Sequence, residues 1–367
     1  MGFFWQRWRP VLLGFLLVLA GLFLGWQTRA WLESWPPVQG AEPSSPPEEA
    51  PPFPPLAGDD PQRFTRSVYF DGLFQPVAMA FGPDGSLYVA QADGTLWALE
   101  PPGRDGHPRN IRLLAADLPD PQGVVVLKKD DLLVRGRGGI WRVQGSQMSL
   151  AVEDLPMASD LSYGLLMTRD RRLLWPQPAG YQPGVLSGSV LAASLDGAVE
   201  VFASGLGRPR SLALDDETGA LYVLDQPQVA GPADLFLLQE NQDYGWPLCT
   251  GEKAGTLSCS GLPEPLWTFS PEGEIWGLLF YTGGAFPPSY QRTFFLTLWG
   301  DPTGKKDGSG VMVAWRGSQG SWNLLPFSKD FWHATALAVD KSGNLYVADM
   351  GRGVIVRFSP SAQDTER

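Results

Sequence analysis

Histidine, cysteine and charged residues are scarce in this sequence. The chain has 2 His and 2 Cys among 367 residues, which rules out a zinc site built from several His and Cys ligands and a disulfide-rich scaffold. Basic residues are also few, because 28 Lys and Arg stand against 39 Asp and Glu, for a formal net charge of -11. Since a nucleic-acid backbone is bound by clustered Lys and Arg, this balance argues against a nucleic-acid partner.

Glycine, proline and tryptophan are abundant instead. The chain has 43 Gly, 34 Pro and 15 Trp, with 44% hydrophobic and only 18% charged residues. This composition favours turn-rich β-structure and argues against long helices, coiled coils and general disorder. The length is compatible with two or three domains, but also with one large all-β domain, because propellers and barrels exceed 250 residues as single units.

A hydrophobic segment near the N-terminus, Pro10 to Trp26, follows Arg7 and Arg9. As a helix its 17 residues would extend ~25 Å, the short end of a membrane span. A cleaved signal peptide has similar features, but no small-residue cleavage site follows, and tryptophans flank both ends of the segment as in an interfacial belt. We therefore expect residues 1–35 to form an uncleaved anchor in a bacterial cytoplasmic membrane. The preceding basic residues predict a cytoplasmic N-terminus and a periplasmic remainder.

Residues 36–62 form a proline-rich segment with ten Pro between Pro36 and Pro61. Such a sequence favours extended polyproline II structure, at ~3.1 Å per residue, and could hold a domain up to ~80 Å from the membrane. We interpret it as a linker. A PxxP ligand for an aromatic groove of another protein is the alternative.

A repeated turn-and-strand pattern occupies residues 63–360. Phe81–Val89 contains an Asp-Gly turn followed by Leu-Tyr-Val, and this pattern recurs at Leu214–Val223 and Val339–Val347, with weaker copies between. The recurring positions are Leu87, Leu132, Leu173, Leu221, Phe295 and Leu345. These six units have the length of propeller blades, so the sequence predicts an all-β fold, a six-bladed β-propeller, followed by a polar tail at 361–367. We expect Arg66–Phe70 to close the ring beside Gly353–Phe358.

The longest step between repeats, Asp225 to Pro271, contains both cysteines. Cys249 and Cys259 have nine residues between them, in a turn-rich segment predicted to be exported. These features favour a local disulfide, and two free buried thiols are the alternative.

Several segments together resemble the glucose/sorbosone dehydrogenase family, and more narrowly its membrane-associated sorbosone and aldose dehydrogenase-like branch. The resemblance extends over roughly residues 64–360 and rests on Pro76–Leu99, Gly205–Asp225, Asp243–Cys249, Phe280–Tyr290 and Ala338–Phe358. It implies a six-bladed propeller that binds pyrroloquinoline quinone (PQQ) and calcium at one end of its channel and oxidises sugars. A tricarboxylate quinone needs basic partners, and calcium needs oxygen ligands.

Several polar elements of this family are altered here. The catalytic His of the family's third blade corresponds to Asp160–Leu165, which has no His. The family's Arg-Asn-Pro element keeps one arginine, Arg208, and the element associated with its metal loop keeps one carboxylate, Asp234. Asp234 and Tyr244 are therefore the candidate metal-binding residues.

Other candidate residues are expected near the same end of the channel. His333 is the only imidazole close to the expected central face and is the candidate substitute base, although a structural histidine at the rim fits the same pattern. The candidates for binding a cofactor or ligand are Arg208, Trp276, Trp299, Lys305 and Arg352. Solvated positions for the cations, and blade-core positions for the tryptophans, are the alternatives.

Two functions are compatible with these observations. In the first, the altered site makes the propeller a binding or scaffold module for a sugar, a peptide or another envelope protein. In the second, the chain is an active quinone-dependent sugar dehydrogenase whose base has moved. PQQ and calcium are implied by the resemblance alone, and the loss of charged elements favours the first function.

Overall fold

The computed structural model describes residues 57–153, 155, 164–178, 188–195, 198–227, 231–249, 259–271, 273–300, 309–317 and 320–361. The predicted membrane anchor lies outside these residues. No helix in the described ranges is long and apolar enough to cross a bilayer.

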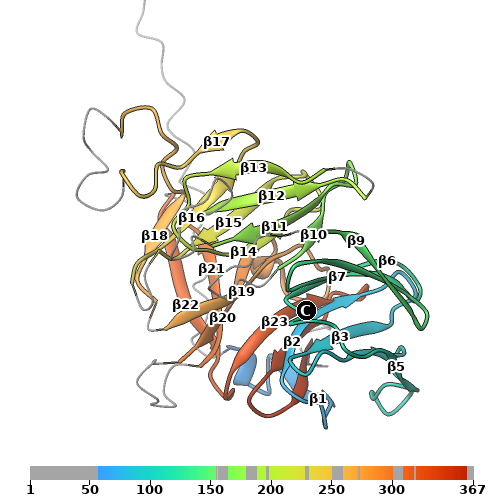
Figure 1. Cartoon of the computed structure of the whole chain (residues 1–367). Coiled ribbons are helices and arrows are strands. Elements are labelled where there is room, and N and C mark those ends of the chain that lie inside the picture. The colour runs from blue at the N-terminus through green and yellow to red at the C-terminus, as the bar shows by residue number, and fades with distance from the viewer. Residues whose placement is uncertain are drawn as a thin grey trace, which may run out of the picture. The chain divides into compact units, whose positions relative to one another are not determined.

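The described chain forms six sheets, which are the blades of a propeller (Figure 1). Blade 1 contains β2 Pro76–Phe81, β3 Leu87–Gln91, β4 Leu96–Leu99 and β5 Ile111–Ala115. Blade 2 contains β6 Gly123–Lys128, β7 Asp131–Gly136, β8 Gly139–Gln144 and β9 Gln147–Val152. Blade 3 contains β10 Leu166–Met167, β11 Leu173–Gln177, β12 Ser189–Ala193, β13 Glu200–Ser204 and the additional β17 Gln242–Asp243. The strands of the six sheets pair antiparallel except for β13 and β17, which pair in parallel.

The second half of the ring has the same organisation. Blade 4 contains β14 Pro209–Leu214, β15 Leu221–Asp225, β16 Ala233–Leu238 and β18 Trp267–Phe269. Blade 5 contains β19 Glu274–Tyr281, β20 Thr293–Trp299, β21 Gly310–Arg316 and β22 Trp322–Ser328, with the short 3-10 helix η4 Pro288–Tyr290 between β19 and β20. Blade 6 contains β23 Ala334–Val339, β24 Leu345–Asp349, β25 Val354–Pro360 and β1 Phe64–Phe70. The predicted six-bladed fold is therefore confirmed.

The ring closes through a blade that both ends of the propeller share. β1 pairs antiparallel with β25, in a register from Phe64 opposite Pro360 to Phe70 opposite Ile355. The inner strands contact one another in the cyclic order β2, β6, β10, β14, β19, β23 and back to β2. The predicted closure by β1 beside β25 is confirmed.

The repeated Leu-Tyr-Val segments supply the blade cores. In the first repeat the Asp84 side chain accepts a hydrogen bond from the Ser86 N–H (3.2 Å) and Gly85 takes a φ of +82°, so the turn reverses the chain. Leu87 and Tyr88 then lie fully buried between neighbouring blades. The alternation of turn and apolar strand thus determines both the hairpin and the face that is buried.

The propeller includes residues that the sequence assigned to the linker. The 3-10 helix η1, Ala57–Asp59, packs on blade 5, and a side chain at Gly58 would clash with Phe327. Asp59 accepts hydrogen bonds from the Ser328 hydroxyl (2.6 Å) and the Lys329 N–H (3.1 Å). The expected boundary at residue 63 therefore falls after the first described contacts with the propeller.

Antiparallel topology brings functional loops to one end of the channel. The first two strands of each blade pair antiparallel, so the start of the inner strand lies beside the end of the second strand. We call this end the channel mouth and the loops that lead into inner strands the mouth loops. Those described in full are 71–75, 116–122, 205–208 and 329–333.

Candidate functional site at the channel mouth

β-Bulges re-aim side chains at the channel mouth. The register of β2, β14 and β19 against the second strand shifts within the first residues of each inner strand, which leaves Val77, Arg210 and Trp276 as the extra residues. Bulges bend a strand and change the direction of its side chains. Trp276 contacts Val77 although blade 6 lies between their two strands. The indole of Trp276 therefore extends across the mouth.

An ion network lies beside this indole. The Glu274 carboxylate pairs with Arg208 and, at 3.3 Å from Oε1 to Nη2, with Arg210. Arg210 is fully buried and also donates from Nε to the carbonyl of Ile275 (3.0 Å). One carboxylate thus pairs with two guanidinium groups, and such pairing offsets part of the cost of burying their charges.

Aromatic rings connect this network to the histidine of blade 6. The Arg210 guanidinium lies 6.0 Å from the ring centre of Trp276, which is 2% exposed. Trp276 and Trp299 make an edge-to-face contact with centroids 4.2 Å apart, and Trp299 meets His333 at 4.7 Å. The structure therefore brings together four of the predicted site residues, Arg208, Trp276, Trp299 and His333, in one continuous cluster.

His333 is the titratable group at the far end of this cluster. Its backbone N–H donates to Asp349 Oδ1 (3.1 Å), and its ring contacts Trp299. Burial lowers the pKa of His333, and the Asp349 carboxylate opposes this shift. The neutral imidazole is therefore favoured near pH 7, which is the form that a general base requires.

Buried polar side chains at the ends of second strands fix the mouth loops. Asp225 accepts hydrogen bonds from the N–H groups of Gly207 (2.9 Å) and Arg208 (2.6 Å). Asp349 accepts from Trp332 (3.0 Å) and His333, and Gln91 accepts from the N–H of Phe74. Burial raises the pKa of Asp225 to about 7, with a further increase from the charge of Asp234, while the two N–H donors oppose the shift.

These loop-fixing residues are absent from the sequence-based candidates, although a signal for them exists. In three repeats the Leu-Tyr-Val segment is followed two positions later by a polar residue, namely Gln91, Asp225 and Asp349. A polar residue at the end of a buried strand indicates a specific hydrogen-bonding role, because an unsatisfied polar group there is costly.

The remaining predicted residues lie outside the cluster. Asp234 is on β16 and accepts from the Thr268 hydroxyl (2.5 Å). The Tyr244 hydroxyl donates to the Leu237 carbonyl (2.7 Å) and accepts from the Gln239 N–H (3.0 Å). These bonds hold the Tyr244 hydroxyl at the C-terminal end of β16, whereas Asp234 lies near the N-terminal end of the same strand. The two candidates therefore do not share a site.

Two predicted cations have different outcomes. Arg352 pairs with Asp330 (2.7 Å) and lies over the ring of Trp332 at 5.9 Å, so it belongs to the rim of the mouth. Lys305 lies outside the described residues, as do positions 160–163 of the segment that lacks the family's histidine.

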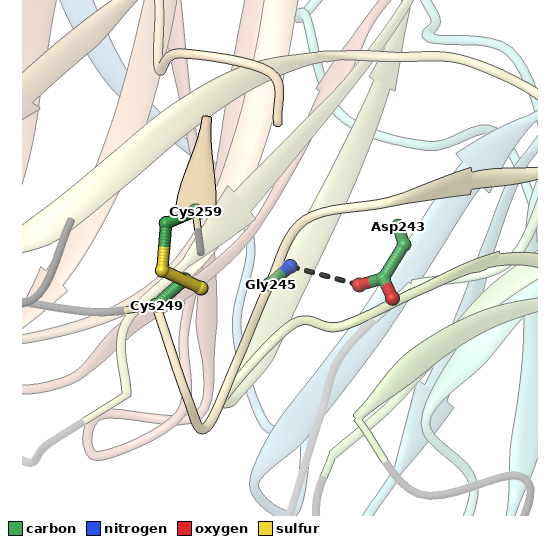
Figure 2. Close-up of a disulfide and its surroundings, with 4 residues drawn as sticks. All are labelled: Asp243, Gly245, Cys249 and Cys259. Atoms are coloured by element: carbon green, nitrogen blue, oxygen red, sulfur yellow. Dashed lines mark hydrogen bonds between the residues drawn. A yellow bond between two sulfur atoms is a disulfide. The ribbon is translucent and has the colours of Figure 1, made fainter. Parts of the chain in front are cut away.

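The predicted Cys249–Cys259 disulfide is confirmed, with the two Cα atoms 5.6 Å apart (Figure 2).

The described donors do not fit calcium and a tricarboxylate quinone. Calcium takes 6–8 oxygen ligands, yet across the described ranges no group of three or more His, Cys, Asp or Glu side chains could hold a metal ion. Arg208 and Arg210 already share the Glu274 carboxylate, and Trp276 extends across the mouth between them and blade 1. We therefore derive no reaction step through either group.

Solved structures similar in fold to this chain include sugar dehydrogenases. A PQQ-bound aldose sugar dehydrogenase from Streptomyces coelicolor has a TM-score of 0.62 and 16% identity, covering 82% of this chain and 99% of its own. A soluble aldose sugar dehydrogenase from Escherichia coli, in its apo form, has a TM-score of 0.63 and 16% identity, covering 81% and 99%. A calcium structure of a Trichoderma reesei protein of carbohydrate-active enzyme family AA12 has a TM-score of 0.64 and 13% identity, covering 82% and 98%. At these identities the likeness is one of fold.

Sequence similarity is confined to part of the propeller. No curated protein matches the chain. The family model for glucose/sorbosone dehydrogenase matches residues 185–299, which contain β12, β13 and β17 of blade 3, all of blade 4 with the disulfide segment, and the first two strands of blade 5. This chain is therefore a six-bladed propeller that resembles the glucose/sorbosone dehydrogenases, in sequence over residues 185–299 and in fold over the ring.

Proposed function

We propose that this chain is a membrane-anchored, extracytoplasmic propeller that binds a ligand at its channel mouth and has lost quinone-dependent sugar oxidation. The observation that carries the proposal is the composition of the mouth, where the buried Trp276 lies beside arginines that already pair with Glu274. A catalytic base and a hard-cation site are separate requirements, so weakening both compounds the loss.

The binding part of the proposal rests on two exposed aromatic rings on the mouth loops. Phe74 is 56% exposed and Trp332 is 50% exposed. Each backbone is fixed by a buried acceptor, Gln91 for Phe74 and Asp349 for Trp332, so the rings are presented by ordered loops. Rigid exposed aromatics are favourable contact residues because little conformational entropy is lost on binding.

A sugar ring is the ligand class we favour for these aromatics, since its apolar C–H face can stack on an indole or phenyl ring while its hydroxyls bond to nearby polar groups. The Arg352 guanidinium lies 5.9 Å from the ring centre of Trp332 and pairs with Asp330. A cationic and an anionic side chain are therefore close enough to bond to the hydroxyls of a sugar at Trp332. A peptide or a second envelope protein is the alternative occupant.

An array of aldoses and oligosaccharides tests the binding proposal with full-length protein in detergent. We expect Trp332→Ala and Phe74→Ala each to lower the affinity for the sugars that the unmodified protein retains by about tenfold, the order expected for one aromatic contact. Leu113→Ala, a similarly exposed apolar side chain on the outer strand β5, is the control and leaves binding unchanged. Equal affinities in all four proteins would contradict the proposal.

Active sugar oxidation is the second candidate function, favoured by the neutral His333 imidazole beside Trp299. The distinguishing assay mixes the full-length protein with PQQ and calcium and follows dye reduction with a panel of aldoses. We expect no quinone uptake and no turnover above the background. Turnover that His333→Ala abolishes would establish the dehydrogenase instead and would overturn the loss of oxidation.

A further inference from the structure

The insertion between β16 and β18 carries the disulfide and lies against a mouth loop. We call its described residues, 243–249 and 259–266, the disulfide lobe. Cys259 is buried, whereas Cys249 is partly accessible. Figure 2 shows the disulfide beside Gly245, whose N–H donates to Asp243 Oδ1 (2.8 Å).

Both sides of the disulfide pack on a single glycine. Gly245 has a φ of +87°, which favours glycine, and its carbonyl accepts from the Cys249 N–H (2.8 Å). A side chain at Gly245 would lie 2.9 Å from Cys249 Cβ and would clash with Leu262, which follows Cys259 in the chain. The disulfide therefore holds the Cys249 and Leu262 segments against Gly245.

The residues on either side of Gly245 bond to the backbone at the start of the mouth loop 205–208. Tyr244 N–H donates to the Ser204 carbonyl (2.9 Å), and Trp246 N–H donates to the Gly205 carbonyl (2.8 Å). A side chain at Gly205 would clash with Asp243, and one at Gly207 would lie 3.0 Å from Trp246 Cδ1. Two backbone hydrogen bonds and these close approaches thus join the lobe to the start of the loop.

The same loop positions the ion network of the mouth. Asp225 holds the N–H groups of Gly207 and Arg208 from the side opposite to the lobe, and the Arg208 side chain then reaches Glu274. A continuous path of direct contacts leads from Cys249 through Gly245 and Trp246 to Gly207 and Arg208. The position of Arg208 consequently depends on the lobe that the disulfide fastens.

We infer that the Cys249–Cys259 disulfide is a redox-sensitive fastening of the channel mouth, and that its reduction releases the loop 205–208 and the Arg208 contact with Glu274. The reductant is a dithiol, which attacks the sulfur of Cys249, the less buried of the two cysteines. The S–S bond breaks, two thiols form, and the dithiol is oxidised to a disulfide with transfer of two electrons and two protons. The inference deepens the proposed function, because it assigns a regulatory state to the same mouth.

Hydrogen exchange followed by mass spectrometry tests this inference on the full-length protein without any ligand. The samples are the oxidised protein, the protein reduced with dithiothreitol, and the Cys249→Ser/Cys259→Ser variant. We expect the amides of residues 204–210 to exchange at least tenfold faster in both altered samples, while peptides from β3 on the other side of the ring keep their protection. Gly207→Ala in the oxidised protein should also give faster exchange at 204–210, because its methyl group would press on Pro227 as well as on Trp246 of the lobe.

Leu248→Ala is the matched control, since Leu248 is on the same lobe, is 75% exposed and leaves the disulfide intact. It should exchange like the unmodified protein. Unchanged exchange at 204–210 after verified reduction would overturn the inference, and so would an equal loss of protection in β3, which would indicate global unfolding. If the double variant does not fold, the exchange of residues 204–210 in the dithiothreitol-reduced native protein tests the inference. Because no ligand is present, this result is independent of the sugar-binding test.

Discussion

The buried carboxylate of Asp225 should make the stability of the propeller depend on pH in an unusual direction. Asp225 is 4% exposed and burial raises its pKa to about 7 from an ordinary value of 3.8. The folded protein therefore binds this proton more tightly than the unfolded chain does. The contribution of Asp225 to the free energy of unfolding is largest below about pH 4 and falls as the pH rises towards about 7.

The magnitude follows from the two pKa values. Their difference, at about 1.4 kcal/mol per pH unit, corresponds to roughly 4 kcal/mol lost between about pH 4 and pH 8. Full burial means that solvent screening does not reduce this value much. Asp225→Asn removes the titration, because an amide has no proton to lose in this range. The variant also loses acceptor capacity for the N–H groups of Gly207 and Arg208, so its stability is lower at acidic pH.

Urea unfolding between pH 4 and pH 8 measures this effect. Other titrating groups cancel when the variant is subtracted from the unmodified protein, and we expect that difference to change by roughly 4 kcal/mol, with the unmodified protein losing its advantage as the pH rises. Glu264→Gln, which replaces an exposed carboxylate after β16 of the same blade, is the matched charge control. A constant difference for Asp225→Asn would refute the raised pKa.

Three further measurements check the site and the topology. Trp276→Ala should lower the free energy of unfolding by about 3–5 kcal/mol in urea, because a fully buried indole leaves a cavity; a change below about 1 kcal/mol would contradict its place across the mouth. Glu274→Ala should lower the free energy of unfolding by about 1–3 kcal/mol in the same assay, because its ion pairs with Arg208 and Arg210 are lost, and an unchanged urea midpoint would contradict a stabilising role for this network. N-terminal sequencing of the membrane-extracted protein should begin upstream of the hydrophobic segment, whereas a start beyond Trp31 would indicate a cleaved signal.

Much of the architecture could be predicted because a local pattern repeats. Each Asp-Gly turn followed by Leu-Tyr-Val specifies a hairpin and a buried face by itself, as Gly85 and Leu87 illustrate. Closure by β1 beside β25 could also be predicted, since apolar alternation at both ends of the repeats leaves two half-filled edges. The additional strand β17 could not, because two residues carry no periodic signal.

The candidate site could be predicted only in part, because the burial of its side chains depends on contacts between strands. Arg208, Trp276, Trp299 and His333 were recognised as chemically suitable residues, and the structure places them in one cluster. Arg210 went unrecognised because an arginine after a proline at the start of a strand resembles a solvated charge. Its burial results from a bulge, which depends on pairing with β15 and is not visible in residue types.

The blade repeats, the closing strand and the disulfide partners follow from the amino-acid order alone, because each depends on local patterns or on the presence of just two thiols. The residues that meet at the channel mouth are set by the packing of the blades. Trp276 meets Val77 across blade 6, and Glu274 joins two arginines from the preceding blade. Such contacts arise when six separate sheets converge on one axis, so their chemistry depends on distances between blades that no single segment specifies.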